Sequence, residues 1–200
     1  MVIAKPPTSR RDEVLRAAAQ LFAEQGFHSV GMRAIADAVG IRGSSLYHYF
    51  PSKIDLLHAI AVDSTRAFIE SQLSDLSPNP TYASSLGKLM RDHVIYFHEH
   101  RMEESVGLRE LQELRRHKPS AYTELQTMRR RYQAAVERMI TEGRASGEFK
   151  CGDPHLTTLA VLGMVNTVND WYRPNRDGAI EKVADAYADI IVGRVLGAEL

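Results

Sequence analysis

Residues 26–53 of this 200-residue chain read GFHSVGMRAIADAVGIRGSSLYHYFPSK, and this stretch decides the fold of the N-terminal part. Its first short helix carries apolar residues on one face, namely Met32, Ile35, Ala36 and Val39. Gly40 ends that helix, and after Gly43 a second short helix places Leu46 and Phe50 four residues apart on its inner side. Two short helices joined by a tight turn that contains glycine are typical of a helix-turn-helix that reads DNA.

A supporting helix precedes this stretch and a longer helix follows it. The preceding helix has one apolar face, formed by Val14, Leu15, Ala18, Leu21 and Phe22, and Gly26 ends it. Ser52 is the expected N-cap of the following helix, whose apolar stripe consists of Ile54, Leu57, Ala61 and Phe68. The sequence therefore predicts a helix-turn-helix domain over residues 1–53 and a second helical domain over residues 54–200.

Helical spacing continues through the rest of the chain. Ser77-Pro78-Asn79-Pro80 predicts a connector, because its two prolines break helices. The next two apolar stripes are Leu86, Leu89, Met90, His93, Val94 and Phe97, and then Tyr122, Leu125, Tyr132, Val136, Met139 and Ile140. We expect Gly143 and Gly147 to end the second of these helices.

Two more helices complete the expected fold. Asp153 is the predicted N-cap, with Pro154 in the first turn, of a helix that runs to about Asn169. The last helix is marked by Ile180, Val183, Ala184, Tyr187 and Ile191. Since no strand alternation or internal repeat is found, the prediction is an all-α fold with about nine helices.

Composition limits the functional classes without selecting one. The chain carries no formal net charge, yet it is +3 through Lys53 and −3 beyond, a weak basic bias in the helix-turn-helix part. The single cysteine, Cys151, cannot form an intrachain disulfide, and no secretory leader pattern is found. The longest apolar run, residues 156–168, is too short and too interrupted to span a bilayer. We expect a cytoplasmic protein.

The identities of the residues in this stretch are specific. The characteristic elements are Gly26-Phe27, Ile35-Ala36, Gly40-Ile41, Leu46-Tyr47-His48-Tyr49-Phe50 and Ser52-Lys53, with Ala18 and Phe22 on the helix before them. Together they closely resemble the DNA-binding segment of the TetR family. The resemblance implies a transcriptional repressor that binds a palindromic operator in double-stranded DNA as a homodimer, and that a small-molecule inducer releases.

The resemblance and the chemistry of the side chains together predict DNA contacts within residues 33–53. The predicted contacts are Arg33, Arg42, Gly43, Ser44, Ser45, Tyr47, His48 and Lys53. Ser44 and Ser45 are small enough to let the backbone approach the groove, and they offer hydroxyls to bases or phosphates. Tyr47, His48 and Lys53 are expected to bind phosphates. The family usually has Ser or Thr where this chain has Gly31 and Arg42, so two helix caps are predicted to be missing.

Other residues of the stretch have a structural interpretation. Ile35, Val39, Leu46 and Phe50 are expected in the core, and for Tyr49 packing is favoured over a direct DNA contact. Ser44 and Ser45 are not part of a G-x-S-x-G elbow, and no H-E-x-x-H, paired E-x-x-H, P-loop or dinucleotide motif is present. A helical-bundle enzyme is therefore the weaker alternative, as is a protein-interaction module; we expect no enzyme activity and no cofactor.

Candidate ligand-binding residues lie in the second domain. They are His93, Phe97, Tyr132, Trp171 and Arg173. Residues 171–174, Trp-Tyr-Arg-Pro, resemble a segment of TetR-type regulators of fatty-acid and steroid breakdown that respond to acyl-CoA thioesters, and sensing of drugs is the alternative. For His93, with His98 and His100 nearby, a buried or pocket-lining role is favoured over a metal site. The basic runs at residues 115–118 and 129–131 are expected to be solvated, or to bind an anionic ligand.

The resemblance also places the dimer interface on the last two helices. Small residues that permit close helix approach are Ala160 and Gly163 on one helix and Ala184 and Ala188 on the other. Packing within one chain would give the same pattern, so both interpretations stay open.

Overall fold

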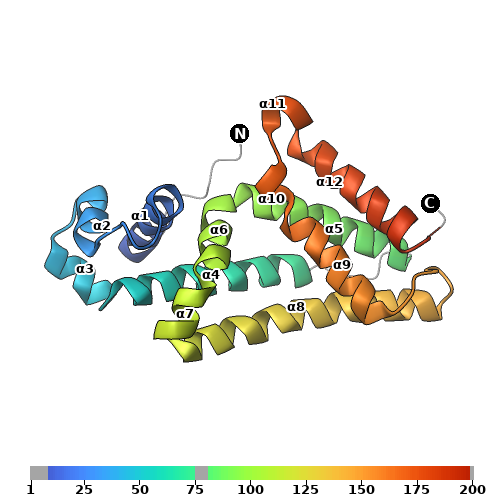
Figure 1. The fold of residues 1–200 in the computed structure, drawn as a ribbon, viewed down its shortest axis with the longest axis horizontal. Coiled ribbons are helices and arrows are strands. Elements are labelled where there is room, and N and C mark those ends of the chain that lie inside the picture. The colour runs from blue at the N-terminus through green and yellow to red at the C-terminus, as the bar shows by residue number, and fades with distance from the viewer. Residues whose placement is uncertain (1–8, 75–80, 199–200) are drawn as a thin grey trace. The chain divides into compact units, whose positions relative to one another are not determined.

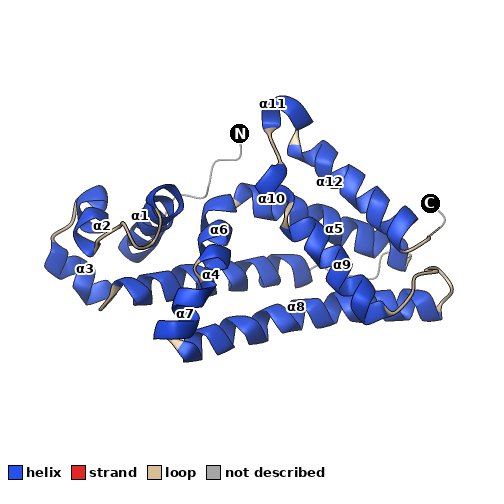
Figure 2. Ribbon diagram, viewed as in Figure 1, coloured by secondary structure: helices blue, strands red, loops and turns tan. Residues whose placement is uncertain are grey.

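The computed structural model describes residues 9–74 and 81–198, and within these ranges it contains helices and loops but no strand (Figure 2). The predicted all-α class is confirmed. The expected connector at residues 77–80 lies outside the described residues. The chain divides into two compact units, residues 9–67 with 100–128 and residues 68–99 with 129–198, each with its own core.

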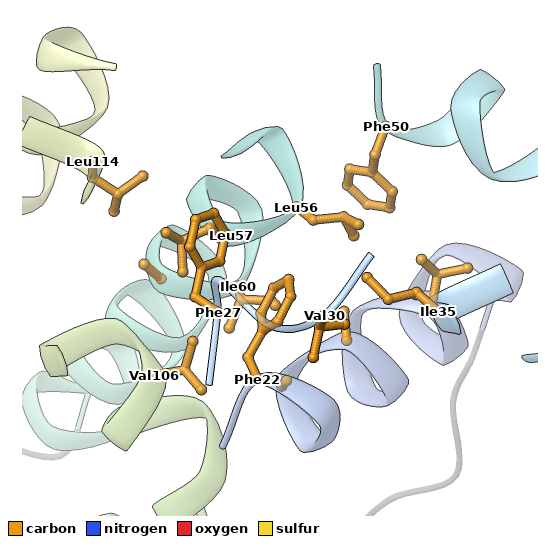
Figure 3. Packing of buried hydrophobic residues seen from close by; sticks show 14 of the residues in the cluster. Phe22, Phe27, Val30, Ile35, Phe50, Leu56, Leu57, Ile60, Val106 and Leu114 are labelled. Atoms are coloured by element: carbon orange, nitrogen blue, oxygen red, sulfur yellow. The ribbon is translucent and has the colours of Figure 1, made fainter. Parts of the chain in front are cut away.

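The first unit is built around the helix-turn-helix (Figure 1). Its helices are α1 (Arg10–Gln25), α2 (Met32–Val39), α3 (Gly43–Tyr49), the first part of α4 (Lys53–Leu73), α6 (Arg101–Arg109), α7 (Leu111–His117) and the first turns of α8 (Pro119–Ala145). Figure 3 shows the core that these helices share, to which α1 contributes Phe22, α2 Ile35 and α4 Leu56. The supporting helix α1 packs on both α2 and α6.

Local hydrogen bonds explain where the helices of this unit begin and end. The Oγ atom of Ser9 accepts from the N–H of Asp12 at the start of α1, and Ser52 accepts in the same way from Asp55 at the start of α4. Gly40 ends α2 in the left-handed region (φ 71°), which lets the N–H of Ile41 reach back to the carbonyl of Ala36. The predicted cap at Ser52 and the predicted end at Gly40 are confirmed.

The second unit contains the remaining helices. They are the end of α4, α5 (Tyr82–Glu99), the rest of α8, α9 (Pro154–Asn166), α10 (Val168–Trp171), α11 (Pro174–Asp177), α12 (Ile180–Asp189) and a π-helical turn, η1 (Ile190–Val195). Helix α5 packs against α12 and α9. The predicted cap at Asp153 is present, since its Oδ1 atom accepts from the N–H of Leu156.

Two predicted helix boundaries differ from the structure. The helix expected to reach Asn169 stops at Asn166, where the hydroxyl of Thr167 donates to the carbonyls of Gly163 and Met164, and the one-turn helix α10 follows. Gly143 does not end α8 but lies inside it; glycine is required there because a Cβ would sit 2.3 Å from the ring of the buried Phe149.

The described residues form more helices than the nine or so expected. The additional ones are short: α6 and α7 cover residues 101–117, and α10 and α11 have four residues each. The four-residue helices α10 and α11 are too short to show an apolar stripe. None of the helices in the described part of the chain combines the length and the apolar character that crossing a membrane requires.

Candidate nucleic-acid interface and ligand cluster

Helix α3 separates its apolar side from its polar side. Leu46 is fully buried and Phe50, directly after the helix, is 4% exposed, while Ile35 of α2 joins them in the same core (Figure 3). These core predictions are confirmed, and Val39 is partly buried against that core. The polar residues of the α2–α3 turn and of α3 are all exposed, namely Arg42, Gly43, Ser44, Ser45, Tyr47 and His48. One face of α3 is therefore free to lie against DNA.

The starts of α2 and α3 lack side-chain caps, as expected from Gly31 and Arg42. Arg33, in the first turn of α2, has a side chain that is 95% exposed and only a distant ion pair, 3.9 Å, with Asp37. Its guanidinium is free to reach a phosphate or a base edge.

Tyr49 corrects one prediction. The sequence pattern favours packing, but Tyr49 is 40% exposed and contacts the ring of His48 edge-on at 6.0 Å between centroids. With Tyr47 at 54% exposure, α3 presents two tyrosines beside its serines. The seven-residue helix has a narrow buried side that Leu46 fills, so Tyr49 faces outward.

Lys53 makes contacts inside the protein that were not predicted. Its ammonium donates to the carbonyl oxygens of Phe27 (2.8 Å), Val30 (3.0 Å) and His28 (3.4 Å), and it lies 4.4 Å from the centre of the Phe27 ring. All three donors of the ammonium are directed at the loop between α1 and α2. In this structure Lys53 therefore holds that loop against the start of α4, and its contact with a phosphate stays a prediction.

A second polar group lies inside the other compact unit, around the fully buried side chain of His93 on α5. The Nε2 atom of His93 is 3.1 Å from Oδ1 of Asn166, and its Nδ1 atom is 3.0 Å from the hydroxyl of Tyr132. Because an amide oxygen only accepts, Nε2 carries the proton and Nδ1 accepts from Tyr132. We call His93, Tyr132 and Asn166 the His93 triad.

Aromatic rings surround this triad. Phe68 contacts His93 at 4.8 Å and Tyr132 at 4.9 Å between ring centroids, and Phe97 lies 4.5 Å from His93. Burial lowers the pKa of His93 to about 3, against the hydrogen bond to Asn166, and burial raises the pKa of Tyr132. Three of the five predicted ligand residues, His93, Phe97 and Tyr132, are thus brought together in a neutral, apolar-walled cluster. Asn166 and Phe68 were not predicted to belong to it.

Two family models match this chain. Residues 14–60 match "Bacterial regulatory proteins, tetR family", and residues 80–195 match "Tetracyclin repressor-like, C-terminal domain". This chain belongs to the TetR family. It is therefore a DNA-binding transcriptional repressor of the TetR type and not an enzyme.

Individual TetR-type proteins resemble the chain over most of its length. The repressor KstR2 of Mycolicibacterium smegmatis is 28% identical over 94% of this chain and 92% of its own. PfmR from Thermus thermophilus is 28% identical, with a TM-score of 0.82 over 90% of this chain and 96% of its own. AibR in complex with isovaleryl coenzyme A and operator DNA has a TM-score of 0.81 at 23% identity, over 96% and 100%, a likeness of fold.

The remaining two predicted ligand residues of this TetR-type chain lie outside the His93 triad. Trp171 is 36% exposed and stacks on Tyr187 of α12, with ring centroids 6.0 Å apart. Arg173 is exposed and donates to the backbone carbonyls of Tyr172 (2.8 Å) and Asp170 (3.4 Å). Among the described residues no group of three metal-binding side chains is found, and both ring nitrogens of His93 already face Tyr132 and Asn166.

The last helices of this TetR-type chain expose an apolar surface. On α9, Leu156 and Leu159 are 66% and 46% exposed, and Ile190 at the end of α12 is 43% exposed. Ala160 and Gly163 lie on the same exposed side of α9. Ala184 and Ala188, by contrast, are buried within the unit, where α12 packs on α5. Their small size is explained by packing inside one chain, one of the two interpretations that the sequence leaves open.

Proposed function

We propose that this TetR-family repressor binds a palindromic operator as a homodimer and is released by an acyl-CoA thioester. The exposed polar face of α3, built on the buried Leu46, carries the first part of the proposal. Its serines, glycine and tyrosines are residues that can enter a major groove and bond to base edges and phosphates. Residues 1–53 form the DNA-binding part and residues 54–200 the part that binds the inducer and the second subunit. The protein acts in the cytoplasm, where the operator is.

We assign different roles to the residues around α3. Ser44, Ser45 and Arg42 read bases, with Gly43 allowing close approach, while Tyr47, His48 and Arg33 bind phosphates. Tyr49, exposed beside His48, joins the phosphate contacts. Lys53 acts at one remove by holding the α1–α2 loop in place.

The dimer is proposed to form through α9 and the end of α12. Leu156, Leu159 and Ile190 are large apolar side chains that face solvent in the single chain, and pairing would remove this surface from water. A two-fold dimer sets the reading helices one DNA turn apart, about 34–36 Å.

The inducer is proposed to bind in the apolar interior around the His93 triad. Phe97 and Tyr132 provide apolar wall. The amide N–H groups of Asn166, at the exposed end of the triad, can donate to a carbonyl, because its Oδ1 atom is the one that faces His93. Trp171 and Arg173 keep a ligand role on the resemblance of residues 171–174 alone. AibR, whose solved complex contains isovaleryl coenzyme A and operator DNA, gives a precedent within the fold. Inducer binding would stabilise a spacing of the reading helices that no longer fits the operator.

The DNA part is tested by a mobility-shift titration against the DNA that flanks the protein's own gene. We expect a dimer–operator complex whose affinity falls steeply with salt, because bound phosphates release counterions. Binding-site selection should return a changed motif for Arg42→Ala and Ser45→Ala, and an unchanged motif for Tyr47→Phe. Salt-independent binding, or no binding to promoter DNA, contradicts the proposal.

The dimer is tested by sedimentation at micromolar concentration. Leu156→Asp together with Leu159→Asp changes two exposed positions, so we expect folded monomers that bind the operator poorly. Val183→Asp is the matched control for misfolding, since Val183 is only 8% exposed within the chain. A wild-type monomer would contradict the proposed interface.

The inducer is tested by titrating the repressor–operator complex with acyl-CoAs, the matching free acids and a panel of cationic drugs. Release by acyl-CoAs alone supports the proposal. Release by cationic drugs with no response to any CoA ester would instead favour a multidrug-type sensor, which needs only the same apolar interior.

A further inference from the structure

A hollow of about 410 Å³ lies on the surface of the second unit. It is lined by the last turn of α4 and one face of α8, through Leu73, Arg131, Ala134, Ala135 and Arg138. Its volume is in the range of sites that hold small molecules. None of these residues belongs to the His93 triad or to its aromatic wall, so the hollow is a separate feature.

The α8 face of this hollow is cationic at both ends and small in the middle. Arg131 and Arg138 are seven residues apart, two helical turns, which sets their Cα atoms about 10 Å apart along the axis. Ala134 and Ala135 lie between them and leave the space open, while Leu73 provides an apolar wall. A ligand here meets two guanidiniums and an apolar floor.

Among the described residues, Arg131 and Arg138 have no carboxylate partner. None of the described residues that line the hollow is acidic. Other arginines of the same unit are neutralised: Arg91 pairs with Asp185 at 2.6 Å and Arg176 with Asp177 at 2.7 Å. Glu137, next to Arg138 in sequence, pairs instead with His155 at 3.0 Å. The positive charge at the hollow is therefore available to an anion.

We propose that this hollow binds the nucleoside-diphosphate head of coenzyme A through Arg131 and Arg138. Two cations spaced by two helical turns match a ligand with more than one phosphate group, and guanidiniums form paired, charge-assisted hydrogen bonds to phosphate oxygens. The apolar floor of Ala134, Ala135 and Leu73 accepts the flat base. The inference rests on the proposed function, to which it adds the place where the charged part of the inducer binds.

The test is isothermal titration of the full-length protein, without DNA, with unacylated coenzyme A. We expect Arg131→Gln and Arg138→Gln each to weaken binding about tenfold, because each removes a charge-assisted contact. Arg130→Gln is the matched control: it removes an arginine from the same helix that does not line the hollow, and it should leave binding unchanged. Thermal melts of all three variants verify that they fold.

Equal losses in all three variants, no loss, or no binding of coenzyme A overturns the proposal. ADP and inorganic pyrophosphate distinguish the chemistry. Weaker binding of ADP through the same arginines supports recognition of the nucleoside-diphosphate head, whereas pyrophosphate that binds as tightly as coenzyme A would show a general anion site and overturn the assignment.

Operator release separates this inference from the proposed function. If coenzyme A binds through Arg131 and Arg138 but no acyl-CoA releases the operator, the hollow is supported and the inducer proposal fails. If acyl-CoA releases the operator from the Arg131→Gln, Arg138→Gln double variant at the wild-type concentration, the inducer proposal holds and the hollow is excluded as its site.

Discussion

The outer face of α3 and the His93 triad use the same kinds of side chain in opposite ways. On α3 the hydroxyl of Tyr47 and the ring of His48 are exposed, so water satisfies them until DNA replaces it. In the triad the hydroxyl of Tyr132 and both ring nitrogens of His93 are buried; Tyr132 is the partner of Nδ1 and Asn166 the partner of Nε2. Removing an exposed polar group of α3 should therefore affect DNA binding but not the free energy of unfolding. Removing a polar group of the triad should lower the free energy of unfolding, because its buried partner is left without a hydrogen bond.

The largest effect is expected where the α3 surface depends on its own core. Leu46→Ala leaves a cavity under the helix, because Leu46 is fully buried, and should lower the free energy of unfolding by about 2–5 kcal/mol. Urea unfolding measures this, and operator affinity should fall with it. A variant that is as stable as wild type would show that α3 is not seated on this core.

Tyr132→Phe removes one hydroxyl from the triad. The Nδ1 atom of His93 then loses its donor while remaining buried, which should lower the free energy of unfolding by about 1–3 kcal/mol. Operator affinity of the folded protein without inducer should not change. If Tyr132→Phe leaves the free energy of unfolding unchanged, water must satisfy the Nδ1 atom of His93 in the variant. The difference between the triad and the face of α3 would then be smaller than proposed.

Lys53 belongs to the DNA-binding part, but its hydrogen bonds are made within the protein. Lys53→Gln should lower the free energy of unfolding by about 1–2 kcal/mol through the lost carbonyl contacts, and weaken binding to all DNA sequences alike. Chemical unfolding and the salt dependence of binding are measured together. Unchanged stability with a reduced salt slope would return Lys53 to a direct phosphate contact.

The pH dependence of stability should reveal His93. Its pKa in the folded protein is lowered by burial to about 3, against about 6.5 when unfolded, so the unfolded state binds the extra proton first. The stability due to neutral His93 is thus complete above about pH 6.5 and is lost as the pH falls toward 3, by up to about 1.4 kcal/mol per pH unit.

The measurement compares wild type with His93→Gln, which keeps hydrogen-bonding groups but does not titrate. Subtracting the two stability curves cancels the contributions of the other histidines. One of these is His155, whose pKa is raised by Glu137 and whose contribution to stability is instead lost as the pH rises. Parallel curves for the two proteins between pH 5 and 7 would contradict the buried, neutral state of His93.

The two regions also differ in how far the sequence can predict them. The helix-turn-helix follows from local signals: the apolar spacing around Ile35 and Leu46, the turn at Gly40 and the cap at Ser52. The contacts of Lys53 with carbonyl oxygens 23–26 residues earlier leave no such signal, because a carbonyl is present at every residue.

In the second unit His93, Phe97 and Tyr132 could be selected as polar or aromatic residues on apolar stripes. Their partner Asn166 could not, since it is 73 residues from His93 and only the packing of α9 on α5 brings them together. The sequence does not predict which sides of α9 and α12 are exposed either. Val183 and Tyr187 share an apolar stripe in the sequence, but Val183 packs within the chain.

Tyr47→Phe gives the smallest effect and the sharpest form of the comparison, because it is the same atomic change as Tyr132→Phe on the other kind of surface. The hydroxyl of Tyr47 has no partner within the described part of the protein, and 54% of the residue is exposed, so its removal should leave the free energy of unfolding within about 0.5 kcal/mol of wild type. Operator affinity should fall by about 0.5–1.5 kcal/mol, the net value of one hydrogen bond, and equally for matched and mismatched sequences, because a phosphate contact carries no sequence information. Fluorescence anisotropy with the operator and with a scrambled duplex at one salt concentration resolves this. If affinity falls for the operator but not for the scrambled duplex, Tyr47 reads bases. If the free energy of unfolding falls, the hydroxyl of Tyr47 has a partner within the protein, as that of Tyr132 has.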